Sequence, residues 1–406
     1  MTELRTTCCI AGGGPAGVML GYLLARAGLP VVVLEKHADF FRDFRGDTIH
    51  PSTMEVLHEL GVLDAFLKRH HDPMRLVGGK IGGEYFEIAD FSHLPTAAKF
   101  VAFMPQWDFL DFLAQEGKRF PTFDLRMGAD ATDLIAEDGR IVGVRATTKD
   151  GALDIRADLV VAADGRHSTI RDRAGFTPMN IGAPIDVLWL RVSRREDDPA
   201  NVLGNIDGGR VLVTLNRGDY WQCAYVIPKD SFEKTRARGL EAFRADLVAI
   251  APFLRDRVGE ITDWDQVKLL TVAVDRLRLW YKPGLLCIGD AAHAMSPVGG
   301  VGVNLAIQDA VAAANILAAP LKNKMLRPDD LAAVQQRREW PVRMMQGLQV
   351  VIQNRVLSPV VFGGGKPLKP AWPLYLFRWF PFLRRFPARI IGMGFRPEHV
   401  RTPAAF

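Results

Sequence analysis

The stretch TTCCIAGGGPAGVMLGYLLARAGLPVVVLE, residues 6–35, decides the fold of this 406-residue chain. A short apolar β run, Thr6 to Ala11, ends at three glycines, and apolar residues then recur at helical spacing from Pro15 to Ala27. Gly28 ends this helix, and the apolar run VVVL at 31–34 predicts a second strand. Two strands joined through one helix over so short a span indicate a parallel sheet.

The turn between the first strand and the helix has the pattern Gly12-x-Gly14-x-x-Gly17. Gly12 permits a tight turn, Gly14 lets the backbone approach a pyrophosphate, and Gly17 lets the helix pack close to the sheet. The start of the helix offers free N–H groups and positive dipole to phosphates. Glu35 ends the second strand, where an acidic side chain accepts hydrogen bonds from an adenosine ribose. These features predict a bound dinucleotide.

The spacing of apolar residues predicts helices and strands in the rest of the chain. Residues 53–67 and 107–120 read as helices, and 133–155 reads as a hairpin. Alternating strands at 187–192, 210–215 and 220–227, with a helix near 239–250, predict a second, antiparallel sheet, and a long helix follows at 329–355. The expected fold class is α/β: a Rossmann-like cofactor-binding domain from 1–70, 100–176 and 282–330, with a smaller mixed or antiparallel β-sheet domain for the substrate from 71–99 and 177–281. A C-terminal helix and tail cover 331–406.

Two later segments indicate which dinucleotide is bound. The stretch 284–310 has a strand, then Gly289-Asp290, then a glycine-rich turn that enters a helix at Asn304. Asp290 is placed to bind a ribityl hydroxyl, and the backbone of the glycine-rich turn can approach the pyrimidine edge of a flavin. A further strand at 158–162 ends at Asp164-Gly165, which is also a common turn pair. FAD is therefore the expected cofactor.

Taken in this order and spacing, the three motifs resemble the class A flavoprotein monooxygenases of the para-hydroxybenzoate hydroxylase type. The resemblance covers residues 5–320 and implies a set of cofactor-binding positions. Those for the ADP half of FAD are Gly12, Gly14, Pro15, Ala16, Gly17, Glu35 and Lys36. Arg45 is implied beside the flavin, Gln106 near its ribityl and phosphate region, and Asp164 with Gly165 in the middle motif. Those for the ribityl chain and the ring are Asp290, Pro297, Gly299, Gly300, Gly302, Val303 and Asn304. The turn reads GGVG here, where the family often has GGQG.

The resemblance also implies an activity. NADH or NADPH, bound transiently, reduces FAD, and O₂ captured as a flavin C4a-hydroperoxide hydroxylates an aromatic, phenolic or quinol-like small molecule. The sequence has one complete GxGxxG, which argues against a separate NADPH domain. Candidates for a direct catalytic role are Tyr220, Tyr225 and His293, although aromatics on a strand usually pack and His293 is expected to be held by backbone.

Three alternative functions remain on the same scaffold. A flavin-dependent halogenase has a WxWxIP signature, but both tryptophans are replaced in the corresponding stretch, residues 223–228. A flavin-dependent reductase of isoprenoid or other double bonds would give a saturated product without oxygen insertion. A flavin-binding protein without enzymatic activity would not turn over NAD(P)H.

Composition limits the other functional classes. The net charge is +5 with a pI near 9.0, and the basic residues are scattered, which favours an anionic ligand over nucleic acid. The four cysteines lie in apolar runs and are expected to be buried free thiols, with no disulfide and no metal site. The chain starts without a signal-peptide pattern, and no uninterrupted apolar run reaches 18 residues, so we expect a cytoplasmic protein.

The C-terminal stretch WPLYLFRWFPFLRRFPARIIGMGF, residues 372–395, combines six aromatic residues before 383 with four arginines. Such a composition fits a peripheral membrane contact. Three prolines interrupt any long amphipathic helix here, so the favoured expectation is a cap packed on the cofactor domain or a homodimer contact.

Overall fold

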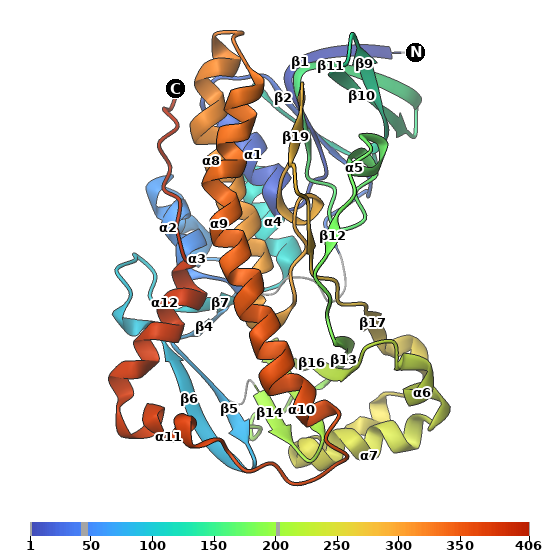
Figure 1. The fold of residues 1–406 in the computed structure, drawn as a ribbon, viewed down its shortest axis with the longest axis vertical. Helices are drawn as coiled ribbons and strands as arrows, with labels where there is room; N and C mark the ends of the chain where they lie inside the picture. Colours follow the sequence, from blue (N-terminus) through green and yellow to red (C-terminus); the bar gives the residue numbers. More distant parts are fainter. Residues whose placement is uncertain (1, 42–47, 200–203, 406) are drawn as a thin grey trace.

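The computed structural model describes residues 2–41, 48–199 and 204–405. A sheet of eight strands forms the first layer, with the main order β19-β20-β11-β1-β2-β8 and with β10 and β9 extending from β11 (Figure 1). Its strands are β1 (Thr2–Ala11), β2 (Val31–Glu35), β8 (Phe123–Met127), β9 (Asp130–Glu137), β10 (Arg140–Thr148), β11 (Gly151–Ala162), β19 (Tyr281–Lys282) and β20 (Leu285–Cys287).

The centre of this sheet is parallel. β1 lies between β11 and β2, and Cys8 is paired with Leu159 on one side and with Val31 on the other. β8 and β20 continue the parallel arrangement outward. The turns that follow β1, β2, β11 and β20 therefore gather at one edge, where α/β sheets bind their ligands. The parallel sheet predicted from residues 6–35 is confirmed.

β11 differs from the sequence prediction. The predicted hairpin arm ending at Ile155 and the predicted strand at 158–162 are one continuous strand, Gly151–Ala162. Its first half pairs with β10 and its end pairs with β20. No break occurs between them because Arg156 and Ala157 remain paired with Arg5 and Thr6 of β1.

Helices α1 (Pro15–Arg26), α4 (Gln106–Gly117) and α8 (Gly302–Lys322) pack side by side on this sheet, and α9 (Pro328–Ile352) lies against α8 (Figure 1). A side chain at Gly21 of α1 would meet Val33 and Phe123 at under 3 Å, so this helix lies directly on the strands. The four cysteines are free and buried, as expected. The stretch Val298–Lys322 is apolar and long enough to cross a membrane, but 78% of its most apolar window is buried inside the protein, as in a core helix.

A second sheet has seven strands in the order β17-β13-β16-β15-β14-β5-β6. β14 pairs parallel with β5 and the other described neighbours are antiparallel, so the sheet is mixed. One face packs on α7 (Leu240–Ile250), and the other packs on α10 (Ser358–Val361). The strands are β5 (Leu76–Ile81), β6 (Glu84–Asp90), β13 (Ile185–Ser193), β14 (Gly204–Asp207), β15 (Arg210–Asn216), β16 (Tyr220–Pro228) and β17 (Lys268–Leu270).

A small sheet, β3-β7-β4, connects the two large ones. It contains β3 (Thr48–Ile49), β7 (Val101–Phe103) and β4 (Asp72–Met74), and β4 leads directly into β5 of the second sheet. The remaining regular elements are short: α2 (Pro51–Glu59), α3 (Leu63–Leu67), α5 (Thr169–Arg173), α6 (Phe232–Ala237), and the strand pair β12 (Met179–Asn180) with β18 (Asp275–Arg276).

The C-terminal tail crosses the molecule. After a π-helical turn at Gln353–Leu357, α11 (Trp372–Trp379) and α12 (Arg385–Met393) pack along β6 of the second sheet. The chain then returns to the first layer, where the Ala405 N–H donates to the Arg26 carbonyl oxygen at the end of α1 (2.9 Å). The tail is therefore a packed cap, as favoured from the sequence, but it covers both layers.

Candidate active site

The first turn provides an open cradle above the start of α1. A side chain at Gly12 would overlap the Ala163 carbonyl group, and one at Gly17 would overlap the Gly12 carbonyl oxygen. At Gly14 an added Cβ would meet only the Ala163 oxygen, at 3.9 Å. Two glycines are therefore required by the packing of the protein itself, whereas the third leaves space that a phosphate group would fill. This fits a dinucleotide.

The start of α1 has unused donors facing this cradle. Gly14 makes no side-chain cap, Pro15 has no N–H, and the first hydrogen bond within the helix runs from Val18 N–H to the Gly14 carbonyl oxygen (2.9 Å). The N–H groups of Ala16 and Gly17 therefore precede the regular bonding of the helix. An anion at this position would accept from them and gain from the helix dipole.

Glu35 lies beside the same turn. Its Oε2 accepts from the Gly13 N–H (3.1 Å), and its Oε1 accepts from the His37 N–H (3.0 Å). The carboxylate is thus fixed next to the cradle, where it could also accept from ribose hydroxyls. Lys36 follows on the exposed side of the chain.

The middle turn packs directly on the first. The backbone of Ala163 and Asp164 is what limits a side chain at Gly12. The Asp164 carboxylate accepts from the Ser168 hydroxyl and from the Ile170 N–H, so it caps the start of α5. Burial raises the pKa of Asp164, although these hydrogen bonds oppose the increase. The turn is thus well placed for the cofactor, but the carboxylate of Asp164 already has structural partners.

The third turn meets the middle one through Arg166. Arg166 Nη2 lies 3.5 Å from Oδ2 of Asp290, whose side chain is about one-third exposed. Neither the spacing nor the resemblance singles out Arg166, and its position directly after Asp164-Gly165 is the one sequence signal for it. The three turns predicted to bind one flavin do converge at one edge of the sheet.

The glycine-rich turn before α8 combines a close contact with open space. A side chain at Gly300 would overlap Oγ1 of Thr48, which donates to the Gly300 carbonyl oxygen (2.8 Å). A Cβ at Gly299 or Gly302 would make only contacts of 3.7–4.0 Å. Pro297 leads into this turn, and the first helical hydrogen bond of α8 runs from Leu305 N–H to the Val301 carbonyl oxygen. The Gly300 N–H already donates to the Pro297 carbonyl oxygen (3.0 Å), so the N–H groups that a flavin ring could use are those of the first turn of α8, at Gly302 and Val303.

The side chain of Asn304, a predicted cofactor residue, has structural partners within the protein. It is buried, and its Oδ1 accepts from the His50 N–H (2.8 Å) and the Thr53 hydroxyl (2.7 Å). Its Nδ2 approaches the carbonyl oxygens of Thr48 and Gly300 (3.3 and 3.4 Å). Asn304 thus ties the glycine-rich turn to the segment that begins at β3. Val303 beside it is buried.

A buried ionic network supports the third turn from below. The Asp309 carboxylate accepts from the Gly289 N–H (3.0 Å), pairs with Nε2 of His293 (2.6 Å), and accepts from Nε of Arg338 (2.9 Å). Burial would raise the pKa of Asp309, but the charges and hydrogen bonds of His293 and Arg338 lower it. Arg338 also approaches Glu398 of the tail at 3.3 Å. The network therefore connects the Gly289-Asp290 turn to α8, α9 and the tail.

The sequence prediction that backbone holds His293 is wrong, because its ring pairs with the Asp309 carboxylate. His293 is buried, and its ring packs at a tilt against Trp280, with ring centres 5.0 Å apart. Tyr225 packs edge-on against Phe243 (5.5 Å between ring centres) on the α7 side of the second sheet. Tyr220 is half-buried at the start of β16. These contacts agree with the packing and structural roles that the sequence favours.

Two further predicted cofactor residues are Arg45 and Gln106. Arg45 lies outside the described residues. Gln106 is half-buried at the first position of α4, next to β7 of the small sheet. All cofactor assignments from the resemblance therefore remain predictions, and those at Gly12, Gly14, Glu35, Asp290 and the glycine-rich turn have supporting geometry.

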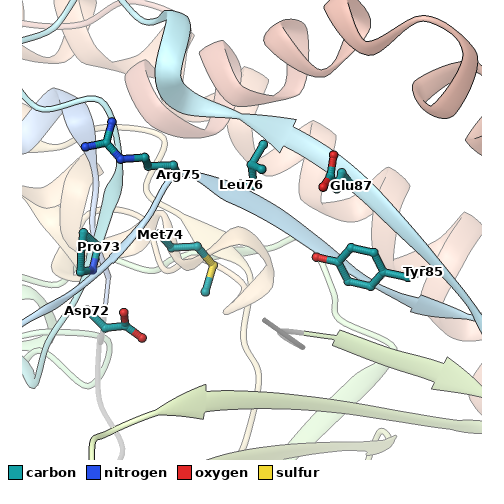
Figure 2. A pocket seen from close by; sticks show the side chains of 7 residues that line it. All are labelled: Asp72, Pro73, Met74, Arg75, Leu76, Tyr85 and Glu87. Atoms are coloured by element: carbon teal, nitrogen blue, oxygen red, sulfur yellow. The ribbon is translucent and has the colours of Figure 1, made fainter. Parts of the chain in front are cut away.

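A cavity of about 380 Å³ lies where the small sheet meets the second sheet (Figure 2). Figure 2 shows the side chains of Tyr85 and Glu87 on β6 near one end of it, and Asp72 and Arg75 near the other. Its wall is completed by the uncharged side chains of Pro73, Met74 and Leu76. All of these residues lie in the segment 71–99 that the sequence analysis assigns to the substrate domain, although no motif singles them out individually.

The small sheet links one lining residue of this cavity, Asp72, to the strand that contacts the glycine-rich turn. Thr48 and Asp72 both pair with Phe103, from opposite sides. Because neighbouring strands lie about 4.8 Å apart, Asp72 is about 10 Å from Thr48, which contacts Gly300.

Comparison with known proteins agrees with this geometry. Residues 5–346 match a family described as FAD binding domain. The chain is 32% identical over 359 residues to 6-methylpretetramide 4-monooxygenase of Streptomyces rimosus, covering 87% of this chain and 85% of that protein. It is 28% identical to a rifampicin monooxygenase of Streptomyces venezuelae, covering 74% of this chain but only 61% of that protein. The solved structure of the anhydrotetracycline hydroxylase OxyS from Streptomyces rimosus superposes with a TM-score of 0.76 at 23% identity, covering 96% of this chain and 76% of that one.

Proposed function

The chain belongs to the FAD-binding family of aromatic-hydroxylase-type monooxygenases, and from this membership we propose that it uses NADH or NADPH to hydroxylate a phenolic or quinol-like aromatic compound. Its 32% identical relative is named for 6-methylpretetramide, and we propose a substrate of that kind. The observation that carries the proposal is the cavity of about 380 Å³ where the small sheet meets the second sheet, a volume within the range for a drug-sized ligand.

Bound FAD would accept a hydride and supply the oxygen chemistry. The protein therefore has to bind the cofactor, orient the substrate and shield the reaction from water. Ala16, Gly17 and Glu35 would hold the adenosine diphosphate, and Asp290 would accept from the ribityl chain. The backbone around Gly299 would face the ring. The preformed fit of the first turn, with required glycines at positions 12 and 17 and open space at 14, supports this assignment.

The cavity offers both apolar contact and polar groups for a phenolic substrate. Met74 and Leu76 would contact the ring, and the Tyr85 hydroxyl would donate a hydrogen bond to a substrate oxygen. Burial, together with the charge of Glu87, raises the pKa of Tyr85, so its hydroxyl keeps the proton at neutral pH. Tyr85 is therefore proposed to bind and orient the substrate, with no proton transfer of its own.

The test is to screen phenolic and quinol compounds for stimulation of NAD(P)H oxidation by FAD-loaded protein, and to measure the product mass. We expect one added oxygen atom. A saturated product with no added oxygen would favour the double-bond reductase, and no stimulated oxidation with any compound would contradict the proposal.

A matched pair of variants tests the cavity. Tyr85→Phe should raise KM several-fold, because a lost hydrogen bond between neutral groups costs about 1 kcal/mol. Tyr281→Phe, on β19 of the first sheet, is the control and should leave KM unchanged. Equal KM values for both variants would place the substrate elsewhere.

A further inference from the structure

The outward surface of α11, α12 and the segment that joins them exposes an unusual number of aromatic side chains. This docking face lies beyond β6, at the lower left of Figure 1. Its aromatic members are between 48% and 72% exposed: Trp372, Trp379, Phe380, Phe382 and Phe386. One exposed apolar side chain needs no explanation, but five within fifteen residues form a surface that favours a partner.

The exposure belongs to a fixed surface, because the inner side of the same segment is packed. The Tyr375 hydroxyl donates to Glu84 (2.8 Å), and its ring packs edge-on against Phe86 (5.3 Å between ring centres). On α12, Ala388 is buried, and a side chain at Gly392 would meet Leu94 at 2.7 Å. The sequence thus divides each helix into a packed side and an aromatic side.

The charge of the segment has one sign. Residues 340–397 contain no Asp or Glu but nine Lys or Arg. Arg378 and Arg384 are paired with Glu84 and Glu87 of β6. On α12, Arg385 and Arg389 are exposed and flank Phe386, so basic and aromatic side chains share the outward surface.

We propose that the docking face binds the surface of a bilayer that contains anionic phospholipids. Exposed Trp and Phe side chains favour the headgroup region, and arginines beside them attract anionic lipid. A second copy of the chain fits less well, because a twofold contact would place two faces of the same positive charge against each other. The surface and its charge carry this inference, and it does not depend on the proposed hydroxylation.

The position of the docking face gives it a consequence for access. A small cavity of about 140 Å³ is lined by Phe86, Arg378 and Arg384, together with Tyr85 and Glu87. The last two residues also line the larger cavity (Figure 2). A bilayer bound to the docking face would therefore lie close to the larger cavity. An apolar aromatic compound dissolved in that bilayer could then enter the cavity.

The experiment is vesicle flotation of the full, FAD-loaded protein. Vesicles of phosphatidylcholine mixed with phosphatidylglycerol should carry the protein upward, and added salt should weaken this binding. Vesicles of phosphatidylcholine alone should bind much less. Failure to float with the anionic vesicles, or equal binding to both kinds, would overturn the proposal.

Paired variants locate the surface. Arg385→Gln with Arg389→Gln should lower vesicle binding about 25-fold, since each basic residue near an anionic surface contributes about fivefold. Lys234→Gln with Arg236→Gln removes the same charge from the exposed side of α6 and should change binding little. Equal losses in the two variants would mean that net charge alone matters, which would overturn the docking face.

A third variant tests the aromatic residues of the docking face without changing its charge. Trp379→Ser with Phe380→Ser should weaken vesicle binding while its salt dependence remains. Thermal unfolding and flavin content confirm that each variant is folded. A stable dimer by light scattering that dissociates in this variant, together with no vesicle binding by the unchanged protein, would assign the face to a second copy instead.

Discussion

Asp309→Asn is the substitution that tests the buried ionic network most directly. The carboxylate accepts from Gly289, His293 and Arg338 at 2.6–3.0 Å, and the side chains of Asp309 and Arg338 are at most 1% exposed. Asn has nearly the same shape but no charge, and its amide NH₂ would face one of the three donors. The guanidinium of Arg338 would then keep only Glu398, at 3.3 Å, as a carboxylate partner among the described residues.

The expected cost follows from this geometry. Breaking a buried pair by removing one partner costs about 3–5 kcal/mol, and the acceptor that Asn retains places the loss near 3 kcal/mol. We expect that loss in the free energy of unfolding of the flavin-free protein, measured by urea denaturation. Flavin affinity should fall as well, because the same carboxylate holds the Gly289 N–H next to Asp290.

Glu241→Gln is the matched control. It also converts a carboxylate into an amide in an ion pair, here with Arg244, but Glu241 is 86% exposed. An exposed pair contributes about 0–1 kcal/mol, so the control should be nearly neutral. If Asp309→Asn also changed the free energy of unfolding by less than about 1 kcal/mol, the buried network would not support the third turn as argued.

Three further outcomes are expected. Burial lowers the pKa of His50 to about 4, so the unfolded chain binds the extra proton between about pH 6.5 and 4. The histidine should therefore remove about 3 kcal/mol of unfolding free energy as the pH falls through this window, and urea denaturation of His50→Asn should show a flatter pH profile than the unchanged protein. Gly14→Ala should unfold like the unchanged protein but bind FAD more weakly in a fluorescence titration. Gly17→Ala should instead lower the melting temperature of the flavin-free protein. A lower melting temperature for Gly14→Ala than for Gly17→Ala would contradict the open cradle at Gly14. Asp290→Ala should weaken FAD binding at least tenfold, because a hydrogen bond to a charged acceptor is worth about 1.5–3 kcal/mol, and full flavin loading at low FAD would refute its assignment.

The parallel sheet and the first turn were predictable because their causes are local. Gly17 is required by a contact within its own turn, with the Gly12 carbonyl oxygen, and that contact recurs wherever a helix follows a strand this closely, whereas Gly12 is limited by the backbone of the distant Ala163. The Asp290 turn was predictable for a related reason, because a buried strand that ends at a glycine marks where the chain turns.

The partner of His293 and the role of Asn304 were not predictable in this way. His293 pairs with Asp309 of α8, and Asn304 bonds to the backbone of His50, far away in sequence. A buried side chain takes the donor or acceptor that folding brings to it, and no pattern of neighbours in the chain specifies which one that is.

The sequence by itself determined the cofactor chemistry: three glycine turns, an acidic residue after the second strand, and a family resemblance that the comparisons confirm. Only the tertiary structure decided which residues of the predicted substrate domain enclose a cavity and which side of the aromatic tail stays exposed. The cavity is formed where β4 of the small sheet continues into β5, which pairs with β6 in the second sheet, and the tail helices hide one side only because β6 lies against it. Such surfaces arise from contacts between elements, whereas the turns are encoded within each element.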